Sequence, residues 1–268
     1  MWYFNLALTR FFDALVWPFQ RWPAGGLVFV SVVAGVAMLL IFKAASNQKA
    51  IRRTRDLIRA HMLAMRLFRD DARVVVESQK KVLRTNLTYL RYAVVPIVFI
   101  LPPVVLIMVQ LNLRYGPAPA QPGEAVVVTA TFDGALDDDV TLAAPPGVAV
   151  ETPALRIPYQ READWRVRPA RAGKYELVVQ SNGKSYGKEL VVGGGGAGRV
   201  SAKRVAGLGA QLMNPGERPL ESGLKAIEVK YPSRENKLFG LGVHWMLTFF
   251  VVSLVAAFAL KGVLKTEV

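Results

Sequence analysis

The chain of 268 residues contains no cysteine and only two histidines, and this removes several kinds of site from consideration. Without cysteine there is neither a disulfide framework nor a thiolate metal centre. His61 and His244 are far apart in the sequence, and no carboxylate pair or Ser/His/Asp grouping stands out. An enzyme is therefore the least supported class, and we expect no catalytic residue, no cofactor and no metal ligand set.

Charge is missing from three long stretches, although the chain as a whole carries a net charge of +14. Each stretch has at least eighteen residues without Asp, Glu, Lys or Arg. Eighteen helical residues rise about 27 Å, which is close to the hydrocarbon thickness of a bilayer. We therefore predict three transmembrane helices, over residues 24–43, 92–113 and 241–261. Prolines inside the second one predict a kink, and they are Pro96, Pro102 and Pro103.

Glycine and proline are absent between the first two spans, from Lys43 to Arg91, and this stretch is intensely basic. It holds thirteen Lys and Arg against four acids, a net of +9. Apolar residues recur at helical spacing in each half. They are Ile51, Ile58, Met62 and Met65, then Val76, Leu83, Leu87 and Leu90. Two matching narrow stripes predict an antiparallel coiled-coil hairpin over residues 44–91.

The reversal of this hairpin is expected between Phe68 and Ala72. There Asp70 or Asp71 can cap the first amides of the second helix. One continuous helix is the competing interpretation. The flanking spans disfavour it, because a straight rod could not return to the bilayer.

The distribution of Lys and Arg gives the predicted orientation. Arg10 and Arg21 precede the first span against Asp13, whereas thirteen basic residues follow it. The positive-inside rule places residues 44–91 in the cytoplasm. The N-terminus and residues 114–240 are then outside, and the tail over 262–268 is inside. These features predict a multi-pass protein of a bacterial inner (cytoplasmic) membrane.

Aromatic residues crowd the N-terminal segment over residues 1–23. They are Trp2, Tyr3, Phe4, Phe11, Phe12, Trp17, Phe19 and Trp22. Asn5, Thr9 and Asp13 are spaced by four and form one polar stripe. The pattern predicts an amphipathic helix that lies in the membrane interface, with Trp and Arg at headgroup level. A signal peptide is the alternative, but a basic start before an apolar core and a small-residue cleavage site are both missing.

Between the second and third spans the composition changes to short β-rich runs separated by turn signals. The runs are 125–132, 139–142, 154–159, 163–167, 173–180 and 184–192, with a further candidate at 225–231. Asn182-Gly183 between two alternating runs predicts a β-hairpin. Many short strands favour an immunoglobulin-like sandwich, a fold that implies no role by itself. Asp137, Asp138 and Asp139 form either a cation site or a solvated turn, and the turn is favoured.

These elements occur in the order of interfacial helix, span, basic hairpin, span, outer domain and span. The most characteristic run is SNQKAIRRTRDLIRAHMLAMRLFRDDAR…LRY, from Ser46 to Tyr115. The chain thereby resembles the three-span core of the YidC-type membrane protein insertase superfamily, over residues 1–113 and 241–268. That superfamily includes the mitochondrial oxidase-assembly insertase and eukaryotic three-span insertase subunits. The inserted outer domain is a departure from its compact members.

The resemblance implies an α-helical membrane protein that helps polar segments of client proteins to cross lipid. It implies a groove among the spans that is open to cytoplasm and lipid and wet enough to hold hydrophilic residues. It also implies that the hairpin receives clients or touches the ribosome. The implied partners are nascent or unfolded membrane proteins, the ribosome, anionic lipid and additional membrane subunits.

Candidate contact residues on the hairpin are Arg52, Arg53, Arg55, Arg59, Met62, Met65, Leu67 and Phe68. The arginines fit either contact with ribosomal RNA phosphates or a solvated face drawn to anionic lipid. The methionines suit varied apolar clients, and coiled-coil packing explains them nearly as well. Candidate groove residues are Ser31, Arg91, Thr248 and Ser253. Hydrogen bonding between helices is the alternative for the hydroxyls, and interfacial anchoring is the alternative for the arginine.

We therefore favour an insertase or membrane-protein assembly factor. The alternative is a membrane-anchored receptor or structural envelope protein whose outer β-sandwich binds a ligand or partner. A subunit of a larger transporter is a weaker hypothesis, because three spans without intramembrane charge make a poor pathway.

Overall fold

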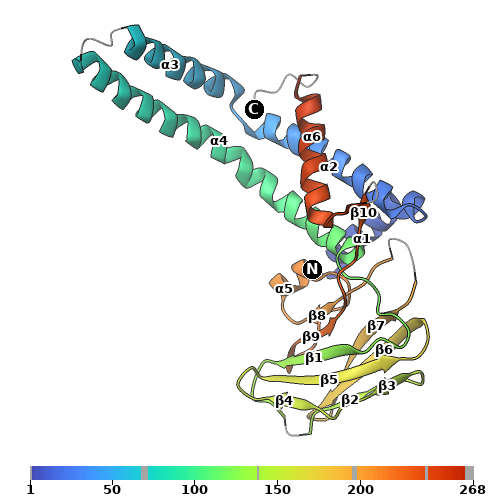
Figure 1. Ribbon diagram of the computed structural model, residues 1–268. Helices are drawn as coiled ribbons and strands as arrows, with labels where there is room; N and C mark the ends of the chain where they lie inside the picture. Colours follow the sequence, from blue (N-terminus) through green and yellow to red (C-terminus); the bar gives the residue numbers. More distant parts are fainter. Residues whose placement is uncertain (1, 68–71, 138, 195–197, 239–240, 263–268) are drawn as a thin grey trace. The chain divides into compact units, whose positions relative to one another are not determined.

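The computed structural model describes residues 2–67, 72–137, 139–194, 198–238 and 241–262 (Figure 1). Its helices are α1 (Trp2–Val16), the 3-10 helix η1 (Trp17–Phe19), α2 (Pro23–Ala45), α3 (Gln48–Leu67), α4 (Ala72–Tyr115), α5 (Leu208–Met213) and α6 (Trp245–Lys261). Its strands are β1 (Val126–Phe132), β2 (Thr141–Ala143), β3 (Val148–Val150), β4 (Leu155–Ile157), β5 (Glu162–Pro169), β6 (Gly173–Ser181), β7 (Lys184–Val192), β8 (Lys203–Val205), β9 (Leu224–Lys230), β10 (Lys237–Leu238) and β11 (Leu241–Gly242).

The chain divides into two compact units, each built from separate stretches of sequence. We call the first the β unit, which comprises Met1–Val30 and Leu106–Thr248. We call the second the helical unit, which comprises Ser31–Val105 and Phe249–Val268. Helices α2, α4 and α6 each contribute residues to both units.

Two antiparallel sheets make up most of the β unit. The larger sheet has the strand order β3-β5-β1-β9-β8, with β4 also paired to β5, and the smaller has the order β2-β6-β7. Alternate side chains along β5 are buried, as expected for strands with one face on a core. Val128 and Trp165 of the larger sheet belong to the same buried cluster as Leu177 and Leu190 of the smaller. The two sheets therefore share one hydrophobic core.

The turn between β6 and β7 confirms the predicted hairpin. Ser181 pairs with Lys184, so the loop has two residues. Both have positive φ, 50° at Asn182 and 71° at Gly183, which is the geometry that an Asn-Gly turn favours. Asp137 holds this turn, since its carboxylate accepts hydrogen bonds from Ser181 Oγ at 3.0 Å and the Asn182 amide at 2.7 Å.

Six of the predicted β-rich runs correspond to β1, β2, β4, β5, β6 and β7, and the candidate at 225–231 corresponds to β9. The sequence patterns did not find β3 or β8, which have three residues each, or α5. Such short elements carry too few residues to show a period. Asp138, part of the predicted acidic turn, lies outside the described residues.

Other parts of the chain cover the edge of β7 that is not paired with β6. The Ala120 amide donates a hydrogen bond to the Val191 carbonyl at 3.2 Å. The Val191 amide donates to Tyr231 Oη at 2.9 Å, and the Glu189 amide donates to Glu217 Oε2 at 3.1 Å. Burial raises the pKa of Tyr231. The backbone of this edge strand is therefore largely satisfied within the chain.

A buried ion pair ties β7 to the segment that follows it. Lys188 is fully buried and donates to Glu217 Oε1 at 2.6 Å, to the Ser201 carbonyl at 2.7 Å and to the Glu189 carbonyl at 3.0 Å. Loss of hydration lowers the pKa of Lys188, although the neighbouring Glu217 opposes the shift. An ammonium has three donors, so this group is fully used in holding the fold.

Helix α1 buries Asn5 and Thr9 of its polar stripe together with Phe12 and Val16, and it leaves most of its other aromatic residues outside. Asn5 and Thr9 are buried, whereas Tyr3, Phe4 and Phe11 are exposed. A helix that covers a core from water normally shows the opposite arrangement. The amphipathic helix predicted at the N-terminus is thus present, but its polar face meets protein. Its position in a membrane interface stays a prediction.

The partner of this polar face is the last turn of α4. Arg114 is only 1% exposed, and it donates to Asp13 Oδ1 at 2.6 Å and to the Thr9 carbonyl at 3.0 Å. It also donates to the Gln110 carbonyl at 2.7 Å, while Gln110 Nε2 donates to Thr9 Oγ1 at 3.1 Å. Asp13 further pairs with the half-exposed Arg199 at 3.5 Å. These bonds fasten α1 to the end of α4.

Two helices, α2 and α4, are long and apolar enough to cross a membrane, and α6 is a shorter apolar helix of 17 residues. In the most apolar 18-residue window, 44% of the residues are buried in α2 but only 6% in α4. Helix α4 is therefore unlike the core helix of a water-soluble protein, which is mostly buried. It continues through Pro96, Pro102 and Pro103 and joins the second arm of the hairpin to the predicted second span.

The third predicted span begins later than expected. We predicted residues 241–261, but α6 starts at Trp245. Leu241 and Gly242 instead form β11, which pairs with β10. The sequence contained no charge to mark this boundary, since residues 241–243 are as uncharged as the helix that follows.

Candidate functional site

Helix α3 and the first half of α4 are the two arms of the basic hairpin (Figure 1). Ile51, Ile58 and Met65 of α3 are among its less exposed residues, as predicted, whereas Met62, the fourth member of the predicted stripe, is exposed. The stripe predicted for α4 is wrong. The less exposed positions of this arm are Ser78, Val82, Thr85, Tyr89 and Tyr92, and the exposed ones include Val76, Leu83, Leu87 and Leu90. Both sets repeat at helical spacing, so periodicity alone could not separate them.

The hairpin consequently presents large apolar side chains at its surface. They are Leu57, Met62, Leu63 and Leu67 on α3 and Val76, Leu83, Leu87 and Leu90 on α4. Exposed apolar groups are a common feature of surfaces that bind protein or lipid. Met62 and Leu67 were predicted contact residues and lie in this group. Phe68 and the predicted reversal, with Asp70 and Asp71, lie outside the described residues.

The predicted arginine contacts lie in the first turns of α3. Arg52, Arg53 and Arg59 are exposed, and Arg55 is half-buried. In α4, Lys81 forms an ion pair with Glu77 one turn away, at 2.8 Å. Guanidinium groups on an exposed helix attract phosphates, whether these belong to lipid or to RNA.

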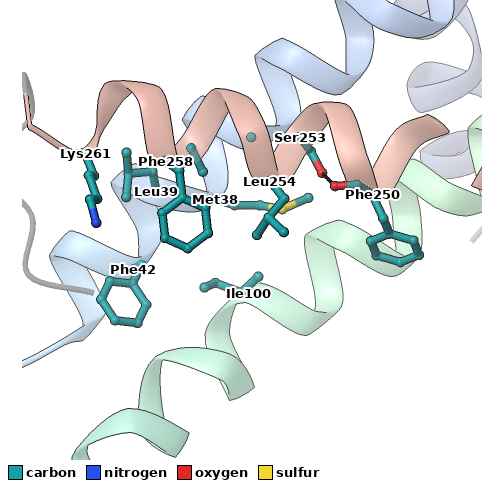
Figure 2. Close-up of a pocket in the computed structure, with 11 residues that line it drawn as sticks. Met38, Leu39, Phe42, Ile100, Phe250, Ser253, Leu254, Phe258 and Lys261 are labelled. Carbon is teal, nitrogen blue, oxygen red and sulfur yellow. Dashed lines mark hydrogen bonds between the residues drawn. The ribbon is translucent and has the colours of Figure 1, made fainter. Parts of the chain in front are cut away.

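A groove of about 310 Å³ lies within the helical unit, among α2, α4 and α6 (Figure 2). It is lined by Gly35, Met38, Leu39 and Phe42 of α2, by Ile100 of α4, and by Phe250, Ser253, Leu254, Ala257, Phe258 and Lys261 of α6. Nearly all of these residues are apolar or aromatic. The groove therefore fits an apolar object, such as one face of a helix or an acyl chain.

Two side chains supply the polarity of this lining. Ser253 Oγ donates to the Phe250 carbonyl at 3.1 Å, so the hydroxyl is used within its own helix. Lys261 Nζ lies 5.1 Å from the ring centroid of Phe258, which is within cation–π range. The ammonium group therefore lies next to the Phe258 ring at one end of the groove (Figure 2). The family resemblance implied a wetter groove than this lining provides.

Close contact between α2 and α6 shapes one end of the groove. A Cβ atom placed on Gly35 would lie 2.3 Å from the Ser253 carbonyl oxygen. Any larger residue at this position would push the two backbones apart. Small residues at such crossings are typical of helices that pack within membranes.

The structure places the four predicted groove residues differently. Ser253 lines the groove. Ser31 and Thr248 are buried but are not among the lining residues, and Arg91 is exposed on α4 away from it. Sequence reasoning selected polar groups because they are rare within spans. It missed the apolar majority of the lining, because a uniformly apolar helix gives no contrast between its faces.

The polar network between α1 and the end of α4 was also missed. The stripe of Asn5, Thr9 and Asp13 had a matching signal in Gln110 and Arg114, which are likewise one turn apart. Comparison of the chain with protein-family models, with curated proteins and with solved structures finds no match. The functional interpretation therefore depends on the hairpin, the groove and the order of the helices.

Proposed function

We propose that this protein is a membrane protein insertase or assembly factor of the YidC-like superfamily. One observation carries the proposal: three apolar helices enclose an apolar groove, and two of them, α2 and α4, continue toward a basic hairpin with exposed leucines. In this proposal α2, α4 and α6 cross the bilayer as three transmembrane helices. The groove and the hairpin receive apolar parts of client proteins.

Exposure of α4 supports its placement in lipid. Its exposed apolar residues include Val94, Val95, Ile97, Val98, Phe99 and Leu101. Burying a large apolar side chain is worth about 1.5–3 kcal/mol, so six left in water would forgo on the order of 10 kcal/mol. Hydrocarbon removes this penalty. The net charge of the hairpin favours its placement in the cytoplasm of a bacterial inner membrane, with the N-terminus and the β unit outside.

The proposed mechanism separates the client into apolar and polar parts. The groove holds an apolar stretch, and its small volume means that one helix face rather than a whole helix enters it. A polar stretch that follows crosses beside the protein, where thinning of the bilayer lowers a barrier of several kcal/mol. The hairpin collects clients first, through its leucines and through arginines that also meet anionic lipid or the ribosome.

Site-specific photocrosslinking tests this proposal. A photoreactive residue at Leu254, in the groove, or at Leu67, on the hairpin, should capture nascent membrane proteins. The same residue at Val98 is the matched control, because Val98 is exposed on α4 but is not among the lining residues. Equal capture at all three positions, or capture at none, contradicts the proposal.

Filling the groove provides a second test. Ala257→Trp should place a large ring in the groove and reduce client insertion several-fold, because Ala257 lines it. Val255→Trp is the control, since Val255 is exposed on the same helix and does not line the groove. Insertion that is impaired equally by both substitutions would point to a general effect of tryptophan on α6.

A receptor or structural envelope protein is the second candidate, and one feature of the β unit favours it. We infer that the two sheets form an immunoglobulin-like sandwich, whose loops commonly bind partners. Tyr159 is 97% exposed and Leu155 is also exposed, beside a cavity of about 510 Å³ lined in part by Arg156 and Arg161. Exposed Tyr and Arg are enriched in protein interfaces. Tyr159→Ala should abolish partner binding in this case and leave an insertase unaffected.

A further inference from the structure

A segment of the β unit has an unusual composition. Residues 206–216 contain no charged side chain, although charged residues are frequent on both sides, with Arg204 before and Glu217 after. Helix α5 lies in the middle of this segment. Leu208 is 69% exposed and Met213 is 55% exposed, whereas the one buried residue of the helix is Gln211. Helix α5 thus resembles α1 in burying a polar residue while two of its three large apolar residues, Leu208 and Met213, are exposed.

The backbone of Gln211 connects the two helices. Asn5 Nδ2 of α1 donates a hydrogen bond to the Gln211 carbonyl at 2.8 Å. Gln211 Nε2 donates to the Glu217 carbonyl at 2.7 Å, which closes the segment on itself. Both helices therefore have their polar side chains joined to protein and leave apolar side chains at the surface.

The chain on both sides of α5 is fixed to the last turn of α4. The Val200 amide donates to the Leu113 carbonyl at 2.8 Å. A Cβ on Gly216 would lie 3.2 Å from Leu113 Cδ2, so this glycine packs against the same turn. Leu113 is buried and adjoins Arg114, which holds α1. Val200 and Gly216, on either side of α5, therefore contact the last turn of α4, to which α1 is also bonded.

We propose that residues 206–216 form a wedge that contacts the lipid of the outer leaflet beside α1. The occupant of this surface is lipid, for three reasons. The surface is free of charge, it adjoins α1 through the Asn5–Gln211 bond, and it lies near the end of an apolar helix long enough to span. Inverted amphipathicity in two joined helices is expected where the surroundings are hydrocarbon and headgroups. The wedge anchors the β unit to the bilayer, so that its position does not depend on the α4 and α6 connections alone.

This inference rests on the placement of α4 in a membrane, and the experiment separates the two. The chain contains no cysteine, so single substitutions can be labelled cleanly in the full-length protein. An environment-sensitive nitrobenzoxadiazole dye is attached at Leu208→Cys and at Met213→Cys. Val98→Cys on α4 reports on the membrane placement, and Tyr159→Cys, on the exposed turn after β4, is the aqueous control.

The labelled proteins are placed in vesicles of phosphatidylethanolamine and phosphatidylglycerol that contain spin-labelled phosphatidylcholine with its nitroxide near the headgroup. The dyes at 208 and 213 should be quenched by the spin-labelled lipid and protected several-fold from soluble iodide, relative to the dye at 159. Iodide quenching at 208 and 213 equal to that at 159 overturns the wedge. Protection from iodide without quenching by lipid also overturns it, since protein would then cover the surface. If Val98 itself is quenched by iodide, the membrane placement fails and the wedge fails with it.

Discussion

The ion pair between Asp13 and Arg114 should control how firmly α1 is attached. Arg114 is 1% exposed, whereas the side chain of Asp13 is 38% exposed. Breaking a fully buried pair costs about 3–5 kcal/mol because one charge is left uncompensated. Solvent screening at Asp13 reduces the cost of breaking this pair, and a hydrogen bond to a charged group contributes about 1.5–3 kcal/mol. We therefore expect Asp13→Ala to lower the local stability of α1 by about 2 kcal/mol.

Hydrogen exchange at the amides of α1 measures this change directly in the full-length protein. A loss of about 2 kcal/mol corresponds to exchange that is roughly 30-fold faster, because each 1.4 kcal/mol is a factor of ten. Arg199→Ala is the matched control, since Arg199 pairs with the same carboxylate at 3.5 Å but is 47% exposed. Its effect should stay below about 0.5 kcal/mol.

A double substitution sharpens the test. Replacing the pair by Asp13→Leu with Arg114→Met removes both charges, so the double variant should lose less stability than the sum of the losses in the two single variants. Unchanged exchange in Asp13→Ala would refute the reasoning. So would an Arg199→Ala effect as large as that of Asp13→Ala, because the buried guanidinium would then be irrelevant.

Three further predictions concern the β unit. The pKa of Lys188 is lowered in the folded state. Between that pKa and the usual value of 10.5 the unfolded chain binds more protons than the folded chain, so the free energy of unfolding should rise with pH. Urea unfolding measured across this pH range should show a smaller rise for Lys188→Met. Gly183 has φ of 71°, so Gly183→Ala should lower the free energy of unfolding by about 1–2 kcal/mol in the same assay. Gly134→Ala is the control, because an added Cβ there meets no atom within 4 Å and the backbone has no positive φ. Equal effects of the two substitutions would contradict this prediction. Residues 117–234 begin and end close together, since the Ala118 amide donates to the Pro232 carbonyl at 2.8 Å. Their deletion should therefore leave client capture at Leu254 detectable. Complete loss of client capture would favour the receptor function.

Sequence reasoning found those parts of the fold in which one residue type controls the local geometry. Asn182-Gly183 requires positive φ at both positions, and the structure has it. Residues 43–91 are free of glycine and proline, and the structure has helix on both sides of residues 68–71. In the β unit the alternating runs became strands, because alternation exposes one face of a sheet and buries the other.

The parts that could not be predicted depend on contacts between distant segments. The side of α4 that faces inward in the hairpin was chosen wrongly, because Leu83 and Tyr89 belong to stripes of equal period. Burial of the polar stripe of α1 depends on Arg114, about a hundred residues later, which no local pattern reveals. The groove escaped prediction for a related reason: Met38, Phe42 and Leu254 differ little from the other apolar residues of their helices.

The covered margin of β7 limits how the β unit can recognise other molecules. Ala120, Glu217 and Tyr231 already occupy the hydrogen-bonding groups that an added peptide strand would need. Strand addition at residues 189–191 of this margin is therefore disfavoured. A partner that binds on this side must therefore be recognised through side chains rather than through backbone pairing.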